Sequence, residues 1–186
     1  MRWKVRDFKI YDDHHQVVRT KCQEFEEPIK EENIQLLKDM CEYLKLSQDD
    51  EYASKHNLRP GVGLACPQIG ISKRGFAVYL EDEKTTYKFG LINPKIIRTS
   101  VKKCYLGSGE GCLSVNASHP GYVMRYNKVV IEGFEVFQNR KVTITAYGYL
   151  AICIQHEYDH LDGILFYDHI DKKEPFKIEE NAIKIA

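Results

Sequence analysis

The sequence lacks an excess of charge of either sign and any long apolar run. Its 27 lysines and arginines balance 27 aspartates and glutamates, so net charge predicts no attraction to DNA or to a membrane surface. No stretch approaches the roughly 18 consecutive apolar residues of a membrane span. The N-terminal stretch MRWKVRDFKIYDDHHQ has no apolar h-region and no small-residue cleavage site, so we expect no secretion and a cytoplasmic location.

Internal repeats, low-complexity tracts and Pro/Gly-rich linkers are also absent from the sequence. We therefore expect one catalytic domain over residues 1–186, a length that is sufficient to bury a hydrophobic core. Six cysteines are present, but they are scattered and have no secretory context. We expect most of them to be buried thiols and not a disulfide framework.

The pattern of apolar residues predicts an α+β domain. Residues 31–46 carry Ile34, Leu37 and other apolar residues at helical spacing, after acidic residues in the first turn. The following segment, QDDEYASKHNLRPG, predicts a polar loop. Asn139 lies in a predicted hairpin turn between the last two of five runs that predict strands: GFAVYL, YKFGLIN, KIIRTS, KVVIEGFEV and KVTITAY.

The segment YLAICIQHEYDHLDG holds two histidines four positions apart in an apolar run. On a helix, His156 and His160 lie one turn apart on one face, a spacing at which two imidazoles can share a metal ion. On a strand they would be about 13 Å apart, so the spacing favours a buried helix packed against antiparallel strands. With Glu157 they form the H-E-x-x-H pattern of a metal site with a glutamate base. The alternative is a pair of core histidines beside a solvated Glu157.

A third metal ligand is expected upstream of this motif. The familiar continuation of H-E-x-x-H places a glycine and then a third histidine, but after Gly163 the histidine position holds Phe166, which cannot ligate. Glu179 or Glu180 is an alternative, although the tail resembles an exposed turn and a terminal strand. Cys112 in the glycine-flanked stretch LGSGEGCLSV is the candidate, because it completes a Cys-His-His set with one position open to water. The alternative for Cys112 is a buried structural thiol.

The second glycine-rich stretch, GVGLACPQIG, matches neither common phosphate-binding motif. The third glycine position of a dinucleotide fingerprint holds Cys66, and no strand clearly precedes the stretch. No Gly-Lys-Ser/Thr follows it, as a phosphate loop would require. Taken by itself, this stretch leaves a surface turn open as the alternative to a functional loop.

Three segments together resemble the signature motifs of the peptide deformylase family in order and spacing: GVGLACPQIG, EGCLSV and QHEYDHLDG. The resemblance runs from about residue 10 to residue 172. SVNASHPGYVMRY and the tail after Asp171 are similar to the longer-insert class, whose chain ends in a strand, while Cys66 departs from the more usual alanine. The resemblance implies a hydrolase that removes the formyl group from the N-terminal formyl-methionine of new polypeptides and releases formate.

The resemblance also implies the metal site. Cys112, His156 and His160 match the ligands, and Glu157 matches the acid/base group. The family's natural ion is ferrous iron, although two imidazoles and a thiolate also suit Zn²⁺, Ni²⁺ or Co²⁺. The substrate would be an N-formylmethionyl peptide, and a cotranslational enzyme of this kind could contact the ribosome transiently.

Further site residues are implied by the same resemblance. Gln68 and the backbone N–H of Leu113 match the donors that stabilise the oxyanion, and Gly63 matches the position whose backbone meets the substrate. Asp159 and the remaining histidines are expected to be structural or surface residues. Other positions match the surroundings of the methionine side-chain pocket: Val62, Glu110, Tyr149, Ile152 and Cys153.

Two other functional classes remain open at the level of sequence. A metal-independent cysteine hydrolase would use Cys112 as its nucleophile, but it leaves the spacing of the two histidines without a function. The second class is a non-enzymatic protein that keeps the metal for structure, or one that binds peptide N-termini without cleaving them. Structural sites usually close all four positions with protein ligands, however, and need no glutamate base.

Overall fold

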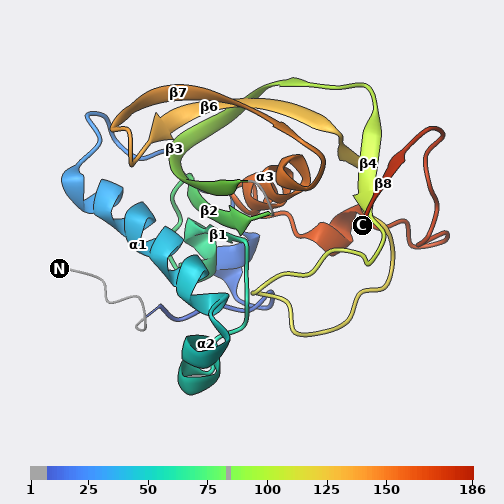
Figure 1. Cartoon of the computed structure of the whole chain (residues 1–186), viewed down its shortest axis with the longest axis horizontal. Coiled ribbons are helices and arrows are strands. Elements are labelled where there is room, and N and C mark those ends of the chain that lie inside the picture. The colour runs from blue at the N-terminus through green and yellow to red at the C-terminus, as the bar shows by residue number, and fades with distance from the viewer. Residues whose placement is uncertain (1–7, 83–84) are drawn as a thin grey trace.

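The structure, a computed structural model, describes residues 8–82 and 85–186 (Figure 1). Residues 1–7, which begin the predicted domain and the N-terminal stretch discussed above, lie outside the described residues, as do residues 83–84. The described helices are α1 (Glu31–Ser47), α2 (Asp50–His56) and α3 (Gly148–His160), with short 3₁₀ turns at Gln16–Arg19, Cys66–Ile69 and Phe166–His169. The described strands are β1 (Gly63–Ala65), β2 (Gly75–Glu81), β3 (Thr86–Thr99), β4 (Lys103–Leu106), β5 (Arg125–Tyr126), β6 (Lys128–Glu135), β7 (Arg140–Tyr147) and β8 (Ile183–Ile185).

The strands form two sheets that share α3 between them. The larger sheet has the order β1-β2-β3-β6-β7 and is antiparallel throughout, whereas the smaller has the order β5-β4-β8 with β4 and β8 parallel. Figure 1 shows α3 near the middle of the molecule, under the arch of β3, β6 and β7, and α3 contacts strands of both sheets. The predicted α+β fold, with antiparallel sheets around the helix that carries the histidines, is confirmed.

Helix α3 is apolar around most of its circumference because it is enclosed on most sides. Its residues from Leu150 to Gln155 are all buried, as expected for a helix in the interior of a domain instead of on its surface. After His160 the chain turns at Gly163, whose φ of +72° favours glycine. A Cβ at that position would lie 2.6 Å from the Arg19 carbonyl oxygen, so the close approach of two backbones also requires glycine there.

The predicted helix at residues 31–46 is confirmed as α1, but the polar loop predicted after it is wrong. Residues Asp50–His56 form α2, because the side chain of Asp49 accepts a hydrogen bond from the Tyr52 N–H at 2.7 Å and caps the helix. Asn57 then ends the helix in a left-handed conformation with φ of 52°. Capping therefore outweighs the polar composition from which a loop was inferred.

The five predicted strand segments are all found, and two of them form the single strand β3. YKFGLIN and KIIRTS join through Asn93 and Pro94, where the pairing of β3 with β6 shifts register. A proline has no N–H for the ladder and is tolerated at such an irregularity. Asn139 occupies the hairpin turn between β6 and β7 with φ of 52°, and the tail ends in β8, both as predicted.

The predicted state of the cysteines is also confirmed, since all six are free and buried. None of the helices in the part of the chain that the structure describes has the length and apolar character needed to cross a membrane.

Candidate metal centre

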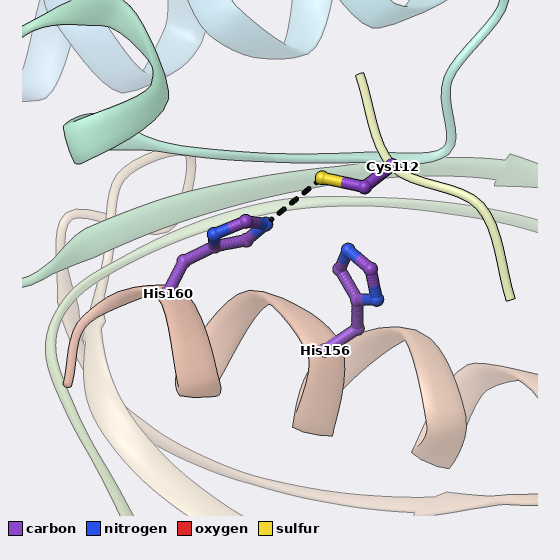
Figure 2. Close-up of side chains that lie close together, drawn as sticks. All are labelled: Cys112, His156 and His160. Carbon is purple, nitrogen blue, oxygen red and sulfur yellow. Dashed lines mark hydrogen bonds between the residues drawn. The ribbon is translucent and has the colours of Figure 1, made fainter. Parts of the chain in front are cut away.

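Cys112, His156 and His160 converge at the centre of the molecule. Their ligand atoms all lie within 4.8 Å of one another, and Figure 2 shows the thiol and both imidazoles directed at the space between them. The histidine rings, one turn apart on α3, have centroids 5.1 Å apart. Cys112 comes from the loop after β4, and its Sγ lies 3.3 Å from His160 Nε2. Two segments far apart in the sequence thus build one donor set.

This donor set fits a divalent cation. A thiol and two imidazoles are the ligands that zinc and similar divalent ions prefer, and three protein ligands leave a position for water. Cys112 and His160 are buried, and only 10% of the His156 side chain is exposed. Burial and the neighbouring positive groups hold the pKa of His160 well below its ordinary value, so this imidazole is neutral and able to ligate.

Glu110 fixes the orientation of His156. Its Oε2 lies 2.9 Å from His156 Nδ1, which leaves Nε2 as the ligating nitrogen of His156. Arg125 donates to the same carboxylate from Nε at 2.8 Å and from Nη2 at 3.0 Å. Burial alone would raise the pKa of Glu110, but the Arg125 charge and the hydrogen bonds from His156 and Arg125 lower it to about 2. Glu110 is therefore ionised although only 3% of its side chain is exposed.

The buried Arg125 links this carboxylate to α3. Its Nη1 also donates to Asp159 Oδ2, and His169 Nε2 lies 2.7 Å from the same oxygen. Buried ion pairs hold their geometry because breaking one leaves an uncompensated charge. No motif pointed to Arg125, because a single arginine outside any motif is usually a surface residue. Asp159 was expected to be structural, and its contacts agree with that expectation.

Glu157 lies beside the donor set in a nearly dry environment. Only 4% of it is exposed, and its Oε2 finds no hydrogen-bond partner among the described residues. Burial raises the pKa of Glu157 to about 7, against the opposing charge of His156. The alternative of a solvated Glu157 is therefore wrong. A Cβ on Gly63 would lie 2.2 Å from Glu157 Oε1, so the carboxylate occupies the space that glycine leaves.

Gln68 faces the centre from the opposite wall. Its Oε1 accepts a hydrogen bond from the Ala65 N–H at 2.8 Å, so the amide nitrogen is turned towards the site. That nitrogen donates to Ser114 Oγ at 3.2 Å and contacts Cys112 Sγ at 3.5 Å. The stretch GVGLACPQIG is thus mostly a short strand and a buried 3₁₀ turn, so the alternative of a surface turn is wrong.

A cavity of about 550 Å³ opens onto these groups. Tyr149, 36% exposed, lies in its lining, whereas the ligand His160 does not border it. Sequence reasoning overlooked Arg59, which also borders the cavity. Eleven of the twelve predicted site residues line it: Val62, Gly63, Gln68, Glu110, Cys112, Leu113, Tyr149, Ile152, Cys153, His156 and Glu157.

Comparisons with known proteins give a consistent result. The family model described as polypeptide deformylase matches residues 8–176. Peptide deformylase 2 of Bacillus subtilis (strain 168) is 49% identical over 177 residues, which cover 95% of this chain and 96% of the relative. Peptide deformylase 2 of Geobacillus stearothermophilus is 45% identical over 178 residues, which cover 95% and 96%.

Solved structures show the same likeness. The peptide deformylase of Ehrlichia chaffeensis superposes with a TM-score of 0.73 at 27% identity and covers 90% of each chain. The peptide deformylase of Synechococcus elongatus, in complex with actinonin, has a TM-score of 0.70 at 28% identity and covers 100% of this chain and 94% of that one.

Proposed function

Because the chain belongs to the polypeptide deformylase family, we propose that Cys112, His156 and His160 hold the divalent metal ion that this family uses. The chain is a hydrolase that removes the N-terminal formyl group from newly made polypeptides. The observation that carries the site assignment is the convergence of these three ligand atoms within 4.8 Å of one another, with Cys112, His156 and the buried Glu157 lining one cavity. The resemblance inferred from the three motifs is confirmed at the level of the family.

When bound, a divalent metal ion would supply Lewis-acid chemistry that makes water a better nucleophile near neutral pH. Glu157 is the general base. In the metal-free protein burial raises its pKa to about 7, and a carboxylate of that kind can both accept and release a proton near neutral pH. It takes the proton of the attacking water and later delivers it to the departing amine. Its burial keeps bulk water from competing for that proton.

Two donors stabilise the negative charge that develops on the formyl oxygen. The Gln68 amide is fixed by the Ala65 N–H and needs no reorientation when the charge appears. The Leu113 N–H, which borders the same cavity, is the second donor. Loss of one such donor typically costs about 100- to 1000-fold in rate.

The pocket beside these donors takes the methionine side chain. Its apolar lining suits a flexible, unbranched residue, and Val62, Tyr149, Ile152 and Cys153 contribute to it. Gly63 presents backbone to the peptide. Glu110 borders the cavity too, but its carboxylate is already bonded to His156 and Arg125. It therefore shapes the cavity wall and makes no hydrogen bond to the substrate.

We propose ferrous iron as the natural ion, with Zn²⁺, Ni²⁺ or Co²⁺ able to occupy the same ligands. A thiolate ligand on iron makes the enzyme sensitive to oxygen, because Cys112 can be oxidised. We further propose that residues 1–186 form one catalytic domain, that the protein works in the cytoplasm, and that it contacts the ribosome transiently while having no DNA or membrane partner.

Formate release from formyl-Met-Ala-Ser tests the proposal directly. The protein is purified without oxygen, its metal content is measured on the same sample, and a chelator provides the control. We expect release that follows one bound divalent ion and stops on chelation. Release that survives metal removal would favour Cys112 as a nucleophile. Absence of release with one stoichiometric metal would favour a binding or structural role.

A further inference from the structure

Arg59, in the segment between α2 and β1, holds the loop that carries the first metal ligand. The guanidinium donates two hydrogen bonds from Nη2, to the carbonyls of Cys112 at 2.9 Å and Val115 at 3.3 Å. It donates two from Nη1, to the Leu113 carbonyl at 3.3 Å and to Asn116 Oδ1 at 2.8 Å. One side chain from a different part of the sequence therefore contacts four residues within 112–116.

These contacts leave Arg59 little capacity for substrate. A guanidinium has five N–H donors and no acceptor, and four of the five are engaged by this loop. Arginine is suited to such a task because its planar fork holds several acceptors in a fixed arrangement, which a lysine ammonium cannot do. Although Arg59 borders the cavity, its contacts indicate a role in organising the loop.

The segment that carries Arg59 is itself anchored to the core. Gly61 N–H donates to the buried Ser47 Oγ at 3.1 Å, and the Gly61 carbonyl accepts from Gln48 Nε2 at 2.8 Å. A Cβ on Gly61 would lie 2.8 Å from Leu113 Cδ1, so the two segments also pack closely. The end of α1 thus fixes the chain from which Arg59 reaches the metal-ligand loop.

The carbonyl contacts of Arg59 determine where two N–H groups point. In a trans peptide the C=O and N–H point in opposite directions, and within the described residues only Glu27-Pro28 is cis. Since the Leu113 carbonyl faces Arg59, the Ser114 N–H must face away, and it does donate to Cys112 Sγ at 3.4 Å. Since the Cys112 carbonyl faces Arg59, the Leu113 N–H faces away too, and it finds no acceptor among the described residues.

We propose that Arg59 is a positioning residue for the deformylation reaction. By holding the carbonyls of Cys112 and Leu113, it presents the Leu113 N–H to the developing oxyanion and the Ser114 N–H to the sulfur ligand. The inference rests on the proposed function, because it concerns the Leu113 donor and the Cys112 ligand of that site. Arg59 itself touches neither the reacting atoms nor the metal.

The test compares Arg59→Ala and Arg59→Lys with Arg98→Ala, which removes an exposed arginine on β3 away from the site. Steady-state formate release gives kcat and KM, and the absorption of the Co²⁺-substituted protein reports the sulfur-to-metal bond. Because a donor would be misaligned but not deleted, we expect kcat to fall about tenfold or more while KM changes little. The sulfur-to-cobalt band shifts in both Arg59 variants, and Arg98→Ala matches the wild type.

A second variant that perturbs the structure less tests the same proposal if Arg59→Ala does not fold. Asn116→Ala removes one acceptor of the guanidinium and leaves Arg59 in place, so we expect a smaller fall in kcat in the same direction. A raised KM with unchanged kcat would overturn the proposal by making Arg59 a substrate-binding residue. So would an unchanged kcat and cobalt spectrum in both Arg59 variants. A wild-type protein that releases no formate would instead refute the proposed function, and the cobalt spectra would still report on positioning.

Discussion

Glu110 Oε2 and His156 Nδ1 lie 2.9 Å apart in the interior of the protein, so a carboxylate outside the proposed ligand set fixes the tautomer of His156, one of the proposed metal ligands. Arg125 holds the other side of that carboxylate through two further hydrogen bonds. The orientation of the proposed ligand His156 therefore depends on Glu110 and Arg125, which are outside the proposed ligand set.

Removal of this carboxylate should weaken metal binding. We expect Glu110→Ala to lower the affinity for Zn²⁺ about 10- to 100-fold, the usual cost of losing a hydrogen-bond partner of a metal-ligating histidine. Competition with a chromophoric chelator measures the affinity. Glu132→Ala, at an exposed position on β6, serves as the matched control. An affinity equal to that of the wild type would show that His156 is oriented without Glu110.

The acid/base role of Glu157 predicts a loss of turnover without a loss of metal. Glu157→Gln keeps the size of the side chain but removes its ability to accept a proton. General acid/base catalysis contributes typically about 100- to 10,000-fold, and kcat should fall within that range. Metal analysis and formate release on the same preparation decide the question. If the variant retains full activity, another group must carry the proton.

Substitution of Gly63 should also lower kcat, because Glu157 occupies the space beside this glycine. A Cβ at this position would lie 2.2 Å from Glu157 Oε1, so Gly63→Ala must displace the carboxylate. We expect a fall in kcat of at least about tenfold, because small misplacements of a catalytic group are costly, with one metal ion still bound since the ligands are unchanged. Measured kcat and metal content equal to those of the wild type would contradict the close packing of these two residues.

The stability of the metal-free protein should depend on pH through Glu157. Burial raises the pKa of this carboxyl from 4.5 to about 7. Since the folded pKa is the higher one, the stabilisation is complete below about pH 4.5 and is lost as pH rises through about 7. Relative to Glu157→Gln, the wild-type free energy of unfolding should fall by up to about 3 kcal/mol across that window. Urea unfolding at pH 5 and pH 8 measures it, and parallel pH profiles for the two proteins would exclude the raised pKa.

The apolar pocket predicts a preference at the formylated residue. Formyl-Met-Ala-Ser should be hydrolysed with a kcat/KM at least about 100-fold above that of formyl-Asp-Ala-Ser, because burial of an unpaired carboxylate costs several kcal/mol. The control is the peptide with formyl-norleucine in place of formyl-methionine, since norleucine keeps the length of the side chain and removes the sulfur. Its kcat/KM should be similar to that of the methionine peptide. Equal rates on the methionine and aspartate peptides would remove Ile152 and its neighbours from the pocket.

The sequence by itself indicated the helices α1 and α3, the strands β2, β3, β6, β7 and β8, and the family, but not the short strands β1, β4 and β5. The four-residue spacing of His156 and His160 brings the two imidazoles together only on a helix. Short apolar runs, alternating or continuous, predict strands. Three short motifs in order were sufficient to indicate deformylation. The helix α2 was missed because its capping residues, Asp49 and Asn57, also occur in ordinary loops.

Only the tertiary structure decided which residues support the site. Arg59 contacts Cys112, 53 positions away in the sequence. Arg125 contacts Glu110, 15 positions before it, and Asp159, 34 positions after it, and no local periodicity encodes such contacts. The buried state of Glu157 on α3 likewise depends on Gly63, which approaches from β1. Local spacing is recorded in the sequence because it follows from the geometry of one helix. The burial and charge that set the pKa values arise only when distant segments pack together.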